Sequence, residues 1–180
     1  MITSKATALN QVASTFTNRK FDFDDSLILD FGCGKGKSKE FCEKEFTNCT
    51  VCLYDPYHNF NQVDTYITAV ANNTEKKKTV ITCNNVLNVL TNNTLLEVLA
   101  QIKKIAELTH TNKIIFKIYE GDKSGIGKIT KNDCYQRNEK TENYVQVITD
   151  NFNNFNNFNN NFNFLVQKKG LFIICTRVNK

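Results

Sequence analysis

A glycine-rich loop directly after a short apolar run constrains the fold of this chain more than any other feature of its sequence. Residues 26–31 read Ser-Leu-Ile-Leu-Asp-Phe, which predicts a buried parallel strand. Gly32, Gly34 and Gly36 follow at alternate positions. Glycines let the backbone pass close to a ligand and adopt torsion angles that other residues resist. A helix expected over residues 37–44 adds free N–H groups beside the loop, so we expect a ligand site there.

Strand-like runs alternate with helical runs in the first two thirds of the chain. Strands are expected at residues 26–31, 50–54, 79–83 and 113–119, and helices at residues 37–44 and 93–108. This alternation is typical of an α/β domain with a mostly parallel sheet. Residues 162–167 and 171–177 flank a Lys-Lys-Gly turn and predict an antiparallel hairpin at the C-terminus. We expect one domain over residues 1–180.

An Asn- and Phe-rich low-complexity insertion, residues 151–161, precedes that hairpin. Phe152, Phe155 and Phe158 lie close to one helical face, although Asn is a poor helix former. We expect an extended helix-to-strand connection whose phenylalanines pack on the core. A platform for stacking bases, or a self-association surface, is the alternative interpretation.

Composition excludes several classes of protein. A chain of 180 residues with 41% hydrophobic residues buries a core without disulfides or metals. The sequence contains no apolar run long enough to span a membrane and no run of the signal-peptide type. We therefore expect a cytoplasmic protein with reduced cysteines. The pair Cys49 and Cys52 lacks the partners of a zinc site, so we expect both to be small buried residues and no bound metal.

Two nucleotide-binding patterns fit the glycine loop poorly. A dinucleotide fingerprint needs Gly-x-Gly-x-x-Gly, and here the third glycine comes one residue early. A P-loop ends in Gly-Lys-Ser/Thr, as residues 36–38 do, but Phe31 stands where its first glycine belongs. Each pattern therefore fails by one residue.

The run Asp-Phe-Gly-Cys-Gly-Lys-Gly over residues 30–36 resembles the cofactor loop of class I S-adenosylmethionine-dependent methyltransferases. In that family the loop wraps the methionine part of the cofactor, and an acidic residue at the end of the second strand binds the ribose hydroxyls. Asp55 stands at that position, and a carboxylate accepts hydrogen bonds from both vicinal hydroxyls. The resemblance implies a Rossmann-like sandwich that binds S-adenosyl-L-methionine through Asp30, Gly32, Gly34, Gly36, Asp55 and Pro56.

Residues 83–90 resemble the fourth motif of the same family, where a strand ends near the transferred methyl group. The resemblance implies that Asn84 and Asn85 bind the cofactor there and that Asn85 is a catalytic candidate. More narrowly, the runs at 5–9, 54–57, 86–90 and 119–125 together resemble small phage and bacterial methyltransferases, some of them associated with DNA-modification clusters. The abundance of Asn and Lys is typical of an AT-rich genome, viral or protozoan.

Some features of this family are not found. Its usual strand between the second and fourth motifs is hard to find in residues 58–78, where residues 64–70 are expected to form a strand or a helix. The Asp/Asn-Pro-Pro-Tyr tetrapeptide of amino-methylating DNA enzymes is absent, and so is the Pro-Cys pair of cytosine C5 enzymes. The mechanism of those base-methylating enzymes has no support in the sequence.

We expect the loop after the fourth expected strand to border the methyl acceptor, because ligands lie at the carboxyl ends of strands in open α/β sheets. Glu120 is the candidate general base. Arg137 with Lys123 or Lys128 is expected to hold an anionic acceptor, and Tyr135 is a further candidate for binding it. The alternative interpretation is an exposed connecting loop that has no functional role and whose charged side chains are solvated.

We therefore expect a methyltransferase that uses S-adenosylmethionine and whose acceptor is a nucleic acid or a small molecule. Two other classes stay open. One is a cofactor-binding pseudoenzyme or a stimulatory subunit of another methyltransferase. The other is a basic nucleic-acid-binding module, which the net charge of +5 favours only modestly.

Overall fold

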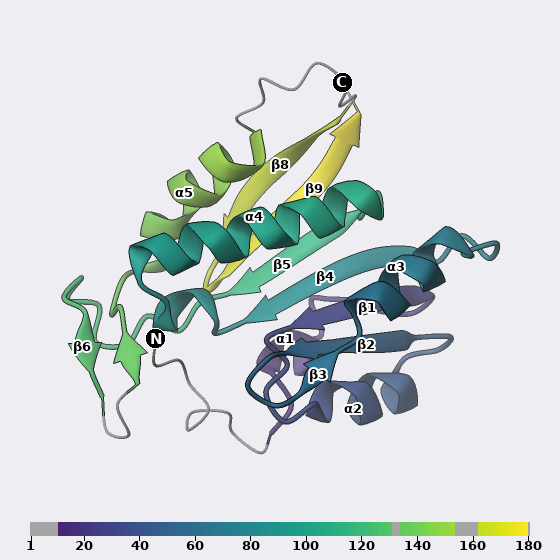
Figure 1. Cartoon of the computed structure of the whole chain (residues 1–180), viewed down its shortest axis with the longest axis horizontal. Coiled ribbons are helices and arrows are strands. Elements are labelled where there is room, and N and C mark those ends of the chain that lie inside the picture. Colours follow the sequence, from purple (N-terminus) through teal and green to yellow (C-terminus); the bar gives the residue numbers. More distant parts are fainter. Residues whose placement is uncertain (1–10, 131–133, 154–161, 180) are drawn as a thin grey trace.

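A mixed sheet organises the molecule (Figure 1). The computed structural model describes residues 11–130, 134–153 and 162–179. Within these ranges the main sheet has seven strands in the order β3-β2-β1-β4-β5-β9-β8. They are β1 (Ser26–Phe31), β2 (Thr50–Asp55), β3 (Phe60–Asn61), β4 (Lys78–Asn84), β5 (Lys113–Lys117), β8 (Phe162–Lys169) and β9 (Phe172–Asn179).

The strand directions follow the expected class of fold. β1, β2, β4 and β5 are parallel to one another, whereas β9 runs antiparallel to β5 and pairs with β8 in a hairpin. A mostly parallel α/β sheet with a C-terminal antiparallel hairpin is therefore confirmed. The chain reverses strand order at β1, because β2 lies on one side of it and β4 on the other. This switch point opens a crevice at the carboxyl ends of the parallel strands.

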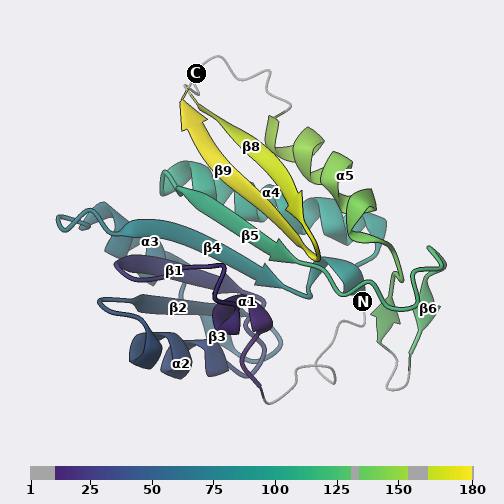
Figure 2. The same ribbon diagram turned by 180° about the vertical axis from the view of Figure 1, so that it is seen from behind.

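Helices cover both faces of the sheet. They are α1 (Ser14–Thr17), α2 (Lys37–Glu45), α3 (Val63–Ala71), α4 (Asn92–Leu108) and α5 (Thr141–Asn153), with a short 3₁₀ turn, η1 (Leu87–Val89). Helices α4 and α5 lie in front of the sheet in Figure 1, and α1 lies in front of it in Figure 2. No helix in the described ranges has the length and apolarity needed to cross a membrane.

The alternating side chains of β1 build two cores. Leu27, Leu29 and Phe31 face α3, α4 and α5, where they join one buried cluster. Ile28 points the other way and packs with Phe16 of α1 and neighbours on α2. Successive side chains of a strand point to opposite faces of the sheet, and both faces here are covered. This explains why every residue of β1 is buried.

The segment between β2 and β4 departs from the family's usual strand. Residues 64–70 are helical and belong to α3. β3 is only two residues long and pairs antiparallel with β2. The apolar residues Val63, Tyr66 and Val70 recur at helical spacing, and Tyr66 is fully buried against the sheet. This packing selects the helical alternative.

The end of α5 meets the C-terminal hairpin. The Phe152 ring is fully buried and contacts the rings of Phe116 and Phe164, with centroids 6.1 and 5.4 Å apart. The Asn153 amide donates to the Phe164 carbonyl (3.0 Å) and accepts from its N–H (3.1 Å). At Phe152 the expected packing on the core is confirmed. Phe155 and Phe158 lie outside the described residues.

The cysteines of the C-x-x-C pair are core residues. Cys49 and Cys52 are both buried and free, on opposite faces of the sheet. This confirms the expectation that they serve as small apolar side chains.

We predict that Leu99→Ala on α4 lowers the free energy of unfolding by roughly 2–5 kcal/mol, because it empties a fully buried site. The matched control is Leu96→Ala on the same helix, where the side chain is 50% exposed and the loss stays below about 0.5 kcal/mol. Urea unfolding of the two variants measures the difference. Equal losses at both positions would contradict the packing described here.

Candidate functional site

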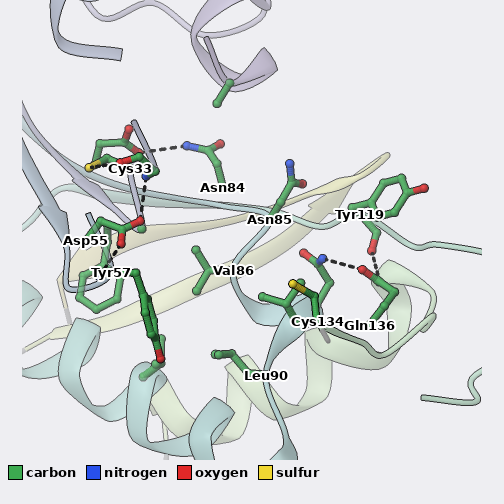
Figure 3. Close-up of a pocket in the computed structure, with 18 of the residues that line it drawn as sticks. Cys33, Asp55, Tyr57, Asn84, Asn85, Val86, Leu90, Tyr119, Cys134 and Gln136 are labelled. Carbon is green, nitrogen blue, oxygen red and sulfur yellow. Dashed lines mark hydrogen bonds between the residues drawn. The ribbon is translucent and has the colours of Figure 1, made fainter. Parts of the chain in front are cut away.

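A cavity of about 970 Å³ opens at the carboxyl ends of the parallel strands (Figure 3). The loop after β1 and the end of β2 line one part of it, and Asn84 and Asn85 lie between this part and the other. The loop after β5, the turn η1 and the strand β7 (Tyr135–Gln136) line the other part. β7 belongs to a two-stranded ribbon whose second strand is β6 (Lys128–Ile129). We call the two parts the loop side and the ribbon side of the cavity.

The glycine loop is held in a left-handed conformation. Gly32, Gly34 and Gly36 have φ angles of +78°, +59° and +70°. The N–H groups of Gly32 and Cys33 both donate to the Tyr54 carbonyl, at 2.7 and 3.2 Å, which ties the loop to β2. A Cβ atom on Gly32 would lie 2.3 Å from Cγ2 of Val86 in the turn after β4. The glycine is therefore needed for both its torsion angle and its size.

Asp55 organises the same loop from the end of β2. Its Oδ2 accepts a hydrogen bond from the Gly34 N–H at 2.8 Å. Its Oδ1 accepts from the N–H groups of Tyr57 (2.9 Å) and His58 (3.2 Å), and the His58 ring nitrogen Nδ1 lies 3.2 Å away. The residue is only 8% exposed yet lines the cavity. The carboxylate is thereby fixed in one orientation at the edge of the site. Pro56 also lines the cavity.

Asp30 lies beneath the loop and is 2% exposed. Its carboxylate accepts from Ser38 Oγ (2.5 Å), Thr82 Oγ1 (2.9 Å) and Asn84 Nδ2 (3.2 Å). Burial raises the pKa of this carboxyl group, and the three hydrogen bonds oppose that rise. The contacts join β1 to α2 and β4, so Asp30 braces the loop in addition to lining the cavity.

The turn after β4 brings two amides to the site. Asn84 and Asn85 both line the cavity. Asn85 is exposed, has a φ of +56°, and its N–H donates to the Lys117 carbonyl at 2.9 Å. The hydroxyl of Thr15 on α1 donates to the Asn84 side-chain oxygen. The structure therefore brings both predicted asparagines together with the glycine loop and Asp55.

The structure does not bring Glu120 to the cavity. Its carboxylate accepts from the N–H and the hydroxyl of Thr141, both at 2.8 Å, and pairs with Lys123 at 3.0 Å. Thr141 is the first residue of α5, so Glu120 satisfies donors at the start of that helix. These bonds, led by the Thr141 N–H, lower the pKa of Glu120 to about 2. Such a weakly basic carboxylate does not suit a general base at neutral pH.

The predicted cations of the acceptor loop are also engaged elsewhere. Lys123 pairs with Glu120 and Lys128 pairs with Asp122 at 2.6 Å. Arg137 donates to Asn92 Oδ1 and Glu139 Oε1, both at 2.7 Å, and to the Leu90 carbonyl at 3.2 Å. None of the three cations lines the cavity. Each opposing carboxylate lies in the same loop as its cation. The expectation that the cations are available took no account of these pairings.

Tyr135 is the one predicted acceptor-binding residue that lines the cavity. Sequence reasoning gave no role to Tyr57, Tyr119 and Gln136, which line it as well. Tyr57 and Tyr119 are 42% and 58% exposed. Each of these two tyrosines lies two residues after the end of a strand, β2 or β5. That position is the only feature of the sequence that could have indicated a place in the cavity.

We predict that Gly32→Ala lowers stability more than Gly125→Ala. Both glycines have positive φ, but no atom lies within 4 Å of a Cβ at Gly125, so this control carries only the torsional cost of about 1–2 kcal/mol. Adding Val86→Ala to Gly32→Ala removes the colliding methyl group and recovers the excess loss. Thermal unfolding of the four proteins measures this. Equal losses for both glycine variants would contradict the close approach.

We predict that Glu120→Ala destabilises the protein by about 1 kcal/mol at pH 7, the usual cost of losing a helix cap. The native pKa is lowered from 4.5 to about 2, so the stabilisation is present above pH 4.5 and is lost as pH falls through 2. The gap between wild type and variant in urea unfolding should therefore shrink from pH 5 to pH 2. Exposed Glu97→Ala on α4 is the control, and a gap independent of pH would refute the capping role.

A known protein family matches the greater part of the chain. A family model described as "Methyltransferase domain" matches residues 6–114, which include the glycine loop, Asp55, Asn84 and Asn85. No curated protein matches the chain at the significance required. Among solved structures, the chain is similar to human N-acetylserotonin methyltransferase in complex with SAM, at 13% sequence identity and a TM-score of 0.48.

That similarity covers 83% of this chain and 47% of the human protein, so this chain spans about half of its length. The family match is independent of that structure and extends over more than half of the present chain. The glycine loop, the carboxylate at the end of β2 and the family match lead to one conclusion, which is that this chain belongs to the methyltransferase domain family.

Proposed function

We propose that this chain is an S-adenosylmethionine-dependent methyltransferase, with residues 1–180 acting as one methyltransferase unit. The observation that carries the proposal is the hydrogen bond from the Gly34 N–H to Asp55 Oδ2. This hydrogen bond joins a close-packed glycine loop to a carboxylate at the end of the adjacent strand. A cofactor made of a nucleoside and an amino acid needs both, the loop for its amino-acid end and the carboxylate for its ribose.

The loop side of the cavity fits the cofactor. The backbone of Gly32, Gly34 and Gly36 carries no side chain toward the methionine end. Two of these positions pack too closely on neighbouring side chains to admit a Cβ. Asp55 offers a carboxylate already oriented by backbone N–H groups, and the lone pair that is left on Oδ2 is available to a ribose hydroxyl. Tyr57 presents an exposed ring beside it for the purine.

The ribbon side of the cavity fits the methyl acceptor. S-adenosylmethionine supplies a methyl group bound to a positively charged sulfur, which leaves as a neutral thioether. The acceptor's lone pair forms the new bond to the methyl carbon, and the acceptor's proton passes to solvent. Asn84 and Asn85 lie between the two sides, where the transferred group would pass. The enzyme's main contribution is then alignment of the two reactants.

The described ribbon-side lining does not offer a strong base. Asp122 is its only described carboxylate, and the Lys128 ammonium holds the pKa of that group well below its usual range. Glu120 is occupied at the start of α5. An acceptor that is nucleophilic without prior deprotonation suits this lining best. A nucleic acid or a small molecule can supply one.

We predict that Asp55→Ala weakens the binding of S-adenosylhomocysteine by about 1.5–3 kcal/mol, or roughly 10- to 100-fold, because hydrogen bonds to a charged group are lost. Isothermal titration calorimetry measures the affinity. Exposed Asp64→Ala on α3 is the matched control and should bind as the wild type does.

A second ligand separates ribose recognition from loosening of the loop. The 2′,3′-dideoxy analogue of S-adenosylhomocysteine should bind the wild type more weakly than the parent compound. The two ligands should bind Asp55→Ala equally, since the partner of the hydroxyls is gone. Absence of binding to the wild type, or a preference for NAD or ATP, would overturn the proposed function.

A further inference from the structure

Two side-chain amides on the ribbon side of the cavity form a relay whose direction is fixed by the backbone (Figure 3). Gln136 Nε2 donates to the Tyr119 carbonyl at 3.3 Å. Its Oε1 accepts from Asn88 Nδ2 at 3.2 Å. A carbonyl only accepts, so the Tyr119 oxygen requires the nitrogen of Gln136 to face it. The oxygen of Gln136 then faces Asn88 and requires the Asn88 nitrogen in turn.

The Asn88 side-chain oxygen is the end of this relay that accepts no hydrogen bond from the described residues. Asn88 is 2% exposed and lines the cavity from η1. Its Oδ1 has no hydrogen-bond partner among the described residues. A buried acceptor without a partner costs free energy, and a bound N–H donor recovers that cost. The site is therefore built to receive a donor and to reject a group that only accepts.

The charged side chains on the ribbon side disfavour an anionic ligand. The cations near it are matched by carboxylates, Lys128 by Asp122 and Arg137 by Glu139. Asp122 itself lines the cavity, whereas the cations do not. An anionic group entering here would meet a carboxylate and no unpaired cation among the described lining residues of this side. An uncharged ligand is therefore favoured over an anionic one.

Two aromatic rings add a preference for a flat ligand. Tyr119 and Tyr135 both line the ribbon side, and Tyr119 is 58% exposed. Tyr135 is positioned by Gly127, because a Cβ there would lie 2.1 Å from the Tyr135 hydroxyl oxygen. Exposed ring faces stack on planar heterocycles.

We propose that the methyl acceptor is an uncharged planar nitrogen heterocycle, of the nucleobase type, that donates an N–H to Asn88 Oδ1. Asn88 is a substrate-orienting residue, and Gln136 positions its amide. This inference rests on the proposed function, because it places the acceptor on the ribbon side of a cavity whose loop side holds the cofactor.

The test uses the full chain saturated with S-adenosylhomocysteine, so that the probes do not occupy the loop side. Two amino-bearing probes whose ring N–H is blocked by a methyl group, 9-methyladenine and 1-methylcytosine, are titrated beside analogues that carry no N–H. The analogues are 6-dimethylamino-9-methylpurine, 9-methylpurine and 1-methyl-2-pyrimidinone. At least one amino-bearing probe should bind roughly tenfold more tightly than its analogues, because a buried acceptor rejects ligands that leave it unpaired.

Asn88→Leu, which is close in size, should abolish this discrimination while leaving the affinity for S-adenosylhomocysteine unchanged. Gln136→Leu keeps Asn88 but frees its amide to turn, and should reduce the discrimination about threefold or more. The Gln136→Leu variant keeps the proposal testable if the Asn88→Leu variant does not fold. Asn143→Leu, which removes an exposed amide on α5, is the control and should discriminate as the wild type does.

The outcomes separate the two proposals. If the wild type binds S-adenosylhomocysteine but shows no preference for amino-bearing probes, or if the preference survives both relay variants, the inference on Asn88 is overturned and the proposed function stands. If the wild type does not bind S-adenosylhomocysteine, the proposed function itself fails. Cytidine and a single-stranded dC oligonucleotide, compared in the same assay, distinguish a small-molecule source of the heterocycle from a nucleic acid.

Discussion

The buried carboxylate of Asp30 is the contact on which the candidate site depends. It accepts hydrogen bonds from Ser38 on α2, from Thr82 on β4 and from Asn84 at the end of β4. One side chain thereby fixes the helix that follows the glycine loop and the turn that carries the cavity asparagines. A carboxylate this deeply buried is expensive unless its oxygens are satisfied, so the surrounding donors are as necessary as the acid itself.

The glycine loop is held by a second layer of contacts above Asp30. The Tyr54 carbonyl accepts from two successive N–H groups of the loop, and Asp55 accepts from Gly34. Val86 fills the space beside Gly32. The end of β2 and the turn after β4 therefore shape the loop between them. A ligand that fills the loop side meets a surface that is already organised, which reduces the ordering cost of binding.

Charged side chains near the ribbon side of the cavity form contacts within the protein itself. Glu120 satisfies donors at the start of α5, and Arg137 binds groups near the start of α4. These contacts brace the ribbon against the body of the domain and leave a cavity wall of amides and tyrosines. Such a wall selects ligands by hydrogen-bond direction and shape, whereas a wall of free lysines would select them by charge.

The sequence by itself determined six of the nine described strands, the helices α2 and α4, and the residues on the loop side of the site. Apolar runs and a Gly-rich turn are local signals, so the strand at residues 26–31 and Asp55 at the end of the next strand were predictable. The alternative of strand or helix at residues 64–70 was open because apolar spacing is ambiguous in short segments; burial of Tyr66 against the sheet decided it.

Only the tertiary structure decided what the acceptor loop does. Whether a charge is free depends on partners such as Thr141 for Glu120, more than twenty residues along the chain. The relay from Tyr119 through Gln136 to Asn88 likewise joins three separate segments, and no spacing in the sequence announces it. Local pattern determines which element a residue occupies, but the availability of its polar atoms depends on contacts that form only when distant segments pack together.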